Sequence, residues 1–186
     1  MNILLEELPK VTPNGYEIST DFRDSIKFEL LMQDNEVENR LKISIALNLY
    51  YKDIPSDIDK ALEDIIWFYK GEKEEKKSTQ TKNKKKEKQI YSYEFDDEYI
   101  YSAFLDQYNI DLNEIDYMHW WKFKALFQGL KEDNQIIKIM GYRSIDLGKI
   151  KDKDEKKRYK ELQKLYALPD MRTVEQKEAD FGSAFW

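Results

Sequence analysis

Residues 56–71 read SDIDKALEDIIWFYKG, and this stretch decides the fold class. Its apolar side chains recur every three or four residues, as they do on one face of an α-helix. They are Ile58, Ala61, Leu62, Ile65, Ile66 and Tyr69. Ser56 stands where an N-cap is expected, and Gly71 stands where a left-handed residue commonly ends a helix. The stretch therefore predicts a helix between these two residues.

Weaker patterns of the same kind lie on both sides of this helix. The N-terminal ones are Phe22, Ile26 and Leu30 after a cap at Thr20 or Asp21, and Val37, Leu41 and Ile45 after a cap at Asp34 or Asn35. We expect these two helices to pack as an antiparallel pair. Upstream of them, Asn14-Gly15 between short apolar segments predicts a short hairpin with a type I′ turn, in which both residues take positive φ.

Four further helices are predicted in the C-terminal half. They are a helix capped by Asp96 with Ile100, Ala103, Phe104 and Tyr108 in register, an aromatic helix from about Asn113 to Phe127, a short element over 136–140 closed by Gly141, and a charged helix over 154–166 with Tyr159, Leu162, Leu165 and Tyr166 on one face. The chain has only 6 glycines and 4 prolines, too few for a turn-rich β architecture. The fold class is therefore all-α, with about six to seven helices.

The composition indicates one helical domain with two polar segments. Hydrophobic residues make up 41% of the chain and charged residues 37%, which is enough for a core beneath a well-solvated surface. Residues 72–89 contain no apolar side chain, so we expect a flexible Lys/Glu-rich loop at 71–90. The predicted domain spans 1–168, and 169–186 form a tail with an aromatic tip, Phe181 to Trp186. That tip fits a docking motif and a chance end equally well.

Charge and cysteine content exclude several classes of function. The net charge of −6 disfavours a nucleic-acid-binding role, because phosphate binding needs a cationic face. The chain has no cysteine, which excludes disulfides and thiolate metal sites. It shows neither a signal peptide nor an apolar run of the roughly 20 residues that span a bilayer. We therefore expect a cytoplasmic protein without a membrane partner.

Catalytic motifs are also missing from the sequence. His119 is the only histidine, and Asp116 is the one acid placed to orient it across a helical turn, an arrangement that serves a structural hydrogen bond equally well. Asp96-Asp97-Glu98 is explained by helix-start stabilisation. No phosphate loop, dinucleotide fingerprint or serine elbow is present. We expect a protein that is not an enzyme and that needs no cofactor or metal.

The aromatic helix is the best candidate for binding another protein. Adjacent tryptophans point about 100° apart on a helix, so Trp120 and Trp121 cannot both face one way. An exposed one would be an interface anchor, and a buried one would belong to the core. The candidate protein-binding residues are Tyr117, Trp120, Trp121, Phe123, Phe127, Tyr142 and Arg143.

Three segments carry a family resemblance. ISTDFRDSIKFELLM (18–32), YSYEFDDEYIYSAFLDQYNIDLNEIDYMHWWKFKALFQGL (91–130) and IKIMGYRSIDLGKIKDKDEKKRYKELQKLYALP (137–169) resemble proteins from the tail-gene modules of long-tailed phages and prophages of Gram-positive bacteria. The similarity runs from about Asn2 to Pro169, and its most specific part is Tyr117–Phe123 together with Gly141–Arg143. Members are encoded just before the tape-measure gene.

The resemblance implies a tail assembly chaperone. Such proteins are helical and bind the long tape-measure helix in the bacterial cytoplasm until tube subunits polymerise around it. A structural tail subunit, retained in the virion, is one alternative. A DNA-binding regulator that uses Gly141–Arg143 and the lysine loop is another. The expected partners are the tape measure or other tail proteins, and a homo-oligomer around the client is left open.

Overall fold

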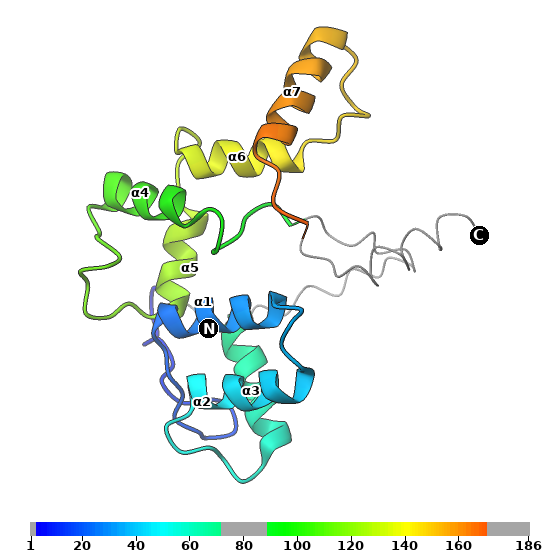
Figure 1. Ribbon diagram of the computed structural model, residues 1–186. Coiled ribbons are helices and arrows are strands. Elements are labelled where there is room, and N and C mark those ends of the chain that lie inside the picture. Colours follow the sequence, from blue (N-terminus) through cyan, green and yellow to red (C-terminus); the bar gives the residue numbers. More distant parts are fainter. Residues whose placement is uncertain (1–2, 72–88, 171–186) are drawn as a thin grey trace. The chain divides into compact units, whose positions relative to one another are not determined.

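The computed structural model describes residues 3–71 and 89–170 (Figure 1). In this part of the chain there are seven α-helices and no sheet, which confirms the all-α prediction. The helices are α1 (Phe22–Gln33), α2 (Asn39–Tyr50), α3 (Ile58–Lys70), α4 (Asp97–Tyr108), α5 (Trp120–Gln128), α6 (Gln135–Ser144) and α7 (Lys153–Leu165). Most of the predicted loop at 71–90 and the aromatic tip at 181–186 lie outside the described residues.

The described residues belong to two compact units. Unit 1 contains residues 3–71, His119–Trp121, Pro169 and Asp170. Unit 2 contains residues 89–118 and 122–168. The single domain expected over 1–168 stays a prediction, and the two units are described one at a time below.

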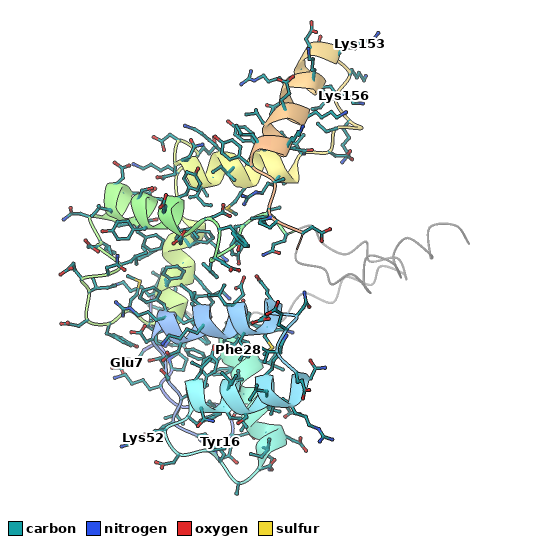
Figure 2. The ribbon with its side chains drawn as sticks, in the orientation of Figure 1. Glu7, Tyr16, Phe28, Lys52, Lys153 and Lys156 are labelled. Atoms are coloured by element: carbon teal, nitrogen blue, oxygen red, sulfur yellow. The ribbon has the colours of Figure 1, made fainter. Side chains whose placement is uncertain are left out.

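Unit 1 is built on α1, α2 and α3. Phe28 of α1 is labelled in Figure 2. Its ring centroid lies 5.5 Å from that of Tyr50 in α2 and 5.2 Å from that of Tyr69 in α3. The Asp21 side chain accepts a hydrogen bond from the backbone N–H of Arg23, which confirms Asp21 as the cap of α1. Gly71 ends α3 with φ at +81°, as predicted.

Two predicted caps of unit 1 are wrong. α2 begins after Glu38, because Asp34 ends α1 and its carboxylate accepts the backbone N–H of Glu36 in the connecting turn. α3 begins after Asp57, whose carboxylate accepts the N–H of Lys60, so Ser56 is one residue too early. In α3 the neighbouring carboxylate of Asp57 takes the role expected of Ser56, whereas the N-cap residue of α2, Glu38, makes no capping hydrogen bond with its side chain.

The predicted apolar faces of these helices are rotated relative to the buried ones. The buried residues are Phe22, Ser25 and Phe28 in α1, Ala46, Leu47 and Tyr50 in α2, and Ala61, Asp64, Ile65 and Phe68 in α3. Leu41, Ile58 and Ile66, which were expected in the core, are exposed. Burial follows the tertiary partners of each helix, which spacing alone does not identify.

The N-terminal hairpin forms, with a different turn from the predicted one. Val11 and Glu17 form an antiparallel bridge, and the Gly15 N–H donates to Thr12 O. Gly15 has φ at +86°, whereas Asn14 does not adopt positive φ. A type I turn followed by a left-handed glycine fits this pattern, because Pro13 presets the second turn position. The type I′ prediction is therefore wrong.

Asp64 joins this hairpin to α3. Its carboxylate accepts hydrogen bonds from Thr12 Oγ1 at 2.5 Å and from Asn14 Nδ2 at 3.0 Å. Asp64 and Thr12 are both buried. A carboxylate out of water needs such donors, so the hairpin turn is what makes a buried acid on α3 tolerable.

Unit 2 contains α4, α6, α7 and most of α5. The core face of α4 is confirmed at Ile100, Ala103 and Phe104. α5 begins at Trp120, so the start predicted near Asn113 is wrong. The Asp111 carboxylate accepts the backbone N–H groups of Asn113 and Glu114 and holds this segment in a turn.

The last two helices also differ from the patterns expected for them. α6 continues through Gly141 to Ser144, so the end predicted at Gly141 is wrong. Gly141 does not adopt the positive φ that ends a helix at a glycine. α7 begins after Asp152, which caps Glu155 N. Leu165, expected on its buried face, is 72% exposed. Among the described residues, no helix is long and apolar enough to cross a membrane.

Candidate functional site

The two adjacent tryptophans are buried in unit 1, where they close the C-terminal end of α3. The indole N–H of Trp120 donates to Tyr69 O at 2.9 Å, and that of Trp121 donates to Phe68 O at 2.7 Å. The last carbonyls of a helix have no partner within it. Trp120 supplies a donor to Tyr69 O, and Trp121 adds a second donor to Phe68 O, which also accepts the N–H of Gly71. Trp120 stacks on the Tyr69 ring at 5.6 Å and Trp121 on the Phe68 ring at 5.9 Å, measured between centroids.

His119 belongs to the same cluster, and its hydrogen bonds define its tautomer. Nδ1 accepts the backbone N–H of Trp121 at 3.0 Å, so this nitrogen carries no proton. Nε2 lies 3.0 Å from Pro9 O and must be the donor, because a carbonyl only accepts. Nε2 thus holds the N-terminal segment at Pro9, Nδ1 holds the backbone of Trp121, and Asp116 is not the partner. This arrangement suits a neutral structural imidazole.

Acid should weaken unit 1 through His119. Burial lowers the pKa of His119 below its usual range, the hydrogen bond to Pro9 O opposes this, and the nearby Lys10 ammonium lowers it further. The unfolded chain therefore takes up a proton first, as pH falls below about 6.5, and the folded state loses stability until its own lower pKa is passed. Protonation would also place an N–H at Nδ1 against the N–H of Trp121.

Urea unfolding at pH 7.5 and 5.5 measures this effect. We expect a lower urea midpoint at pH 5.5 than at pH 7.5. In His119→Gln, whose side chain does not titrate, the two midpoints should differ by less. An equal difference in the variant would contradict the assignment to His119.

Phe123 and Phe127 lie in the core of unit 2. Phe123 is fully buried and stacks on Phe104 with centroids 4.9 Å apart and planes 11° apart. Phe127 lies 5.3 Å from the Tyr91 ring, and Tyr93 contacts both phenylalanines. These rings hold residues 91–93 against α4 and α5, so their contacts are internal to the unit.

Arg143 is the centre of a buried polar network in unit 2. Its guanidinium makes two hydrogen bonds to Asp96, at 2.5 and 2.9 Å, and further bonds to Ile90 O and Tyr166 O. Asp96 also accepts the backbone N–H of Ser92. Arg143 is 6% exposed and Asp96 1%. The neighbouring Tyr142 is half-buried and lies between the rings of Tyr159 and Tyr166.

The seven candidate binding residues are thus not gathered on one surface. Trp120 and Trp121 lie in unit 1, and the others belong to unit 2. Tyr117 is 51% exposed, which makes it the candidate that a partner can reach most directly. The buried ones have partners within the chain, so a direct contact with another protein would require the chain to open around them. Their role in binding stays a prediction.

A half-exposed apolar stripe on α3 is the strongest surface feature of unit 1. Ile58, Leu62 and Ile66 follow one another at a spacing of four residues, and the two isoleucines are 39% and 48% exposed. Ile54, in the segment before the helix, is 44% exposed. The sequence pattern placed Ile58, Leu62 and Ile66 on the same apolar face as the buried Ala61 and Ile65. The apolar residues of α3 cover a wider arc of the helix than one buried face needs, and this width was the sequence signal that some of them are exposed.

Other classes of site find less support in the described residues. No group of three or more His, Asp or Glu side chains there could hold a metal ion. An open pocket of about 370 Å³ in unit 1 is lined by residues 17–19 and 48–52. It offers one carboxylate, Glu17, and one ammonium, Lys52, and its serine, Ser19, donates its hydroxyl hydrogen bond to Asp24.

Comparison with protein-family models gives a match over most of the chain. A family model described as "Bacteriophage Gp15 protein" matches residues 4–168. No curated protein and no solved structure matches the chain.

Proposed function

The chain belongs to the bacteriophage Gp15 protein family, and from this membership we propose that it is a tail assembly chaperone that binds the tape-measure protein. The family match spans 4–168, almost the same residues as the resemblance to tail-module proteins that the sequence shows. In this proposal the protein acts in the host cytoplasm and is not an enzyme. Its client is a long helical protein that aggregates when unaccompanied.

The observation that carries the proposal is the apolar stripe on α3. Ile58, Leu62 and Ile66 lie about 6 Å apart along the helix axis. An amphipathic client helix presents apolar side chains at the same spacing, so two such stripes can interdigitate. A row of isoleucines that remains 39–48% exposed gains free energy by being covered. The Asp57–Lys60 ion pair and Glu63 flank the stripe and keep its rim polar.

The decisive experiment is coexpression of the full chain with the tape-measure protein. The expected result is a copurifying complex, together with aggregation of the tape measure when it is expressed alone. A tape measure that stays dispersed alone and forms no complex would overturn the proposal. A chain found by mass spectrometry in purified tails would support the alternative of a structural subunit.

Shortening the α3 stripe should weaken client binding by about tenfold or more. In Ile58→Ser/Ile66→Ser two apolar anchors are lost, each worth about 1 kcal/mol or more when covered. Both residues are only half-buried, so the helix content measured by circular dichroism should change little. Binding to an immobilised tape-measure fragment measures the effect.

Met32→Ser/Leu41→Ser is the matched control for this variant. It removes two apolar side chains of unit 1 that are 42% and 52% exposed and lie off the stripe. If the control loses as much affinity as the stripe variant, client binding does not depend on α3.

The DNA-binding alternative gains no support from the helix that contains Gly141–Arg143. The Arg143 guanidinium is committed to Asp96, Ile90 O and Tyr166 O. Freeing it would leave the buried carboxylate of Asp96 without its counterion.

A further inference from the structure

One side of α2 is apolar although the helix packs on unit 1 with another side. The packed side is defined by the buried residues Ala46, Leu47 and Tyr50. Leu41, Ile45 and Leu49, which we name the α2 face, lie about 100° or more around the helix axis from the middle of that side. Leu41 is 52% exposed, and Ile45 and Leu49 are half-buried. A row of aliphatic side chains that its own unit leaves partly in water gains free energy when a second surface covers it.

Opposite charges stand at the two ends of the α2 face. Glu38 precedes Leu41 by three residues, and Lys52 follows Leu49 by three. Both charged side chains are exposed, and neither forms an ion pair within the described part of the chain. Figure 2 shows Lys52 extending from the segment that follows α2. The order acid, leucine, isoleucine, leucine, base is therefore symmetric in spacing and opposite in charge about Ile45.

We infer that the α2 face binds the α2 face of a second copy of this chain, with the two helices antiparallel. A two-fold axis at Ile45 brings the two Ile45 side chains together and places each Leu41 opposite Leu49 of the other copy. The same register places Glu38 of each copy opposite Lys52 of the other, so that two ion pairs form. A parallel pair of helices would instead bring Glu38 to Glu38 and Lys52 to Lys52, which repel.

The open pocket of unit 1 lies at the end of the α2 face where this register brings a leucine. Leu49 and Lys52 line it together with the buried Ile18, and its volume of about 370 Å³ has room for a leucine side chain. Leu41 of the second copy, opposite Leu49, therefore meets a depression with an apolar wall. A different protein could also cover an aliphatic row, but the charge order about Ile45 is what a contact between identical surfaces requires.

Sedimentation velocity of the full chain measures the association. Two helices of about three turns make a small interface, so we expect a dimer with a dissociation constant of about 10–100 µM. Ile45→Glu places two carboxylates together at the two-fold axis and should weaken the dimer by about tenfold or more. Ile43→Glu is the matched control, because Ile43 is 42% exposed on the opposite side of the same helix, and its dimer should persist.

Charge reversal tests the register with variants whose folding is not at risk. Glu38→Lys and Lys52→Glu each turn both ion pairs into repulsions, so each should weaken the dimer by about fivefold or more at low salt. Glu38→Lys/Lys52→Glu restores opposite charges and should dimerise like the wild type. A chain that stays monomeric up to about 0.5 mM, equal weakening by Ile43→Glu and Ile45→Glu, or a double variant no better than the single ones would overturn the inference.

The α2 face is separate from the α3 stripe, and the inference does not depend on the tape measure as client. Client binding measured at nanomolar chain concentration concerns monomers. Met32→Ser/Leu41→Ser therefore stays a valid control for the α3 stripe, although Leu41 belongs to the α2 face.

Discussion

Replacing Arg143 by alanine should lower the free energy of unfolding by about 3–5 kcal/mol, the largest effect we expect from any charged residue of the chain. The substitution leaves the Asp96 carboxylate, 1% exposed, without its cation. It also removes the donors to Ile90 O and Tyr166 O, which tie residues 90 and 166 to α6. Urea unfolding followed by circular dichroism measures the loss.

Two further variants distinguish the contribution of the ion pair to stability from nonspecific destabilisation. Arg143→Lys keeps the positive charge but cannot make two parallel bonds to Asp96, so its stability should lie between those of the wild type and Arg143→Ala. Arg40→Ala removes an exposed arginine of α2 and should change stability by no more than about 0.5 kcal/mol. If Arg143→Ala is as stable as Arg40→Ala, the buried Arg143–Asp96 pair does not contribute to the free energy of unfolding.

Replacing Phe123 by alanine should cost about 3–5 kcal/mol of unfolding free energy. The ring is fully buried, stacks on Phe104 and lies 6.2 Å from the Phe127 ring, so its removal leaves a cavity between α4 and α5. Phe123→Leu keeps most of the volume and should cost about 1 kcal/mol. Thermal and urea unfolding of the three proteins give the ranking.

Phe95→Ala is the control for this prediction. Phe95 also belongs to unit 2 but is 40% exposed, so the same truncation should cost clearly less than at Phe123. Equal losses of unfolding free energy at both positions would mean that the burial of Phe123 and its stacking on Phe104 do not stabilise the unit as expected.

Helix number and class could be predicted because they depend on local spacing. Asp21 caps the start of α1 with its side chain, and Gly71 ends α3 in the left-handed conformation that glycine adopts readily. The buried faces could not be predicted, because they depend on partners distant in sequence. Asp64 is the clearest example, since its burial depends on donors at Thr12 and Asn14.

The candidate sites show the same division. An aromatic run at 117–127 suggested one helix with an exposed ring, but Asp111 folds the preceding segment into a turn and the tryptophans are used to cap α3. The charged helix α7 was visible in the sequence, but the side by which it is attached was not. Tyr159, Gln163 and Tyr166 make that attachment, while Leu165 is exposed.

The tryptophans at the end of α3 also give the protein a built-in optical probe. The chain has four tryptophans, and the three that the structure describes, Trp67, Trp120 and Trp121, all belong to unit 1. Emission excited at the indole band therefore reports on that unit, once Trp186 is replaced by phenylalanine. Ellipticity reports on the helices of both units. Comparing the two signals along one denaturation curve would reveal whether the units melt together or separately.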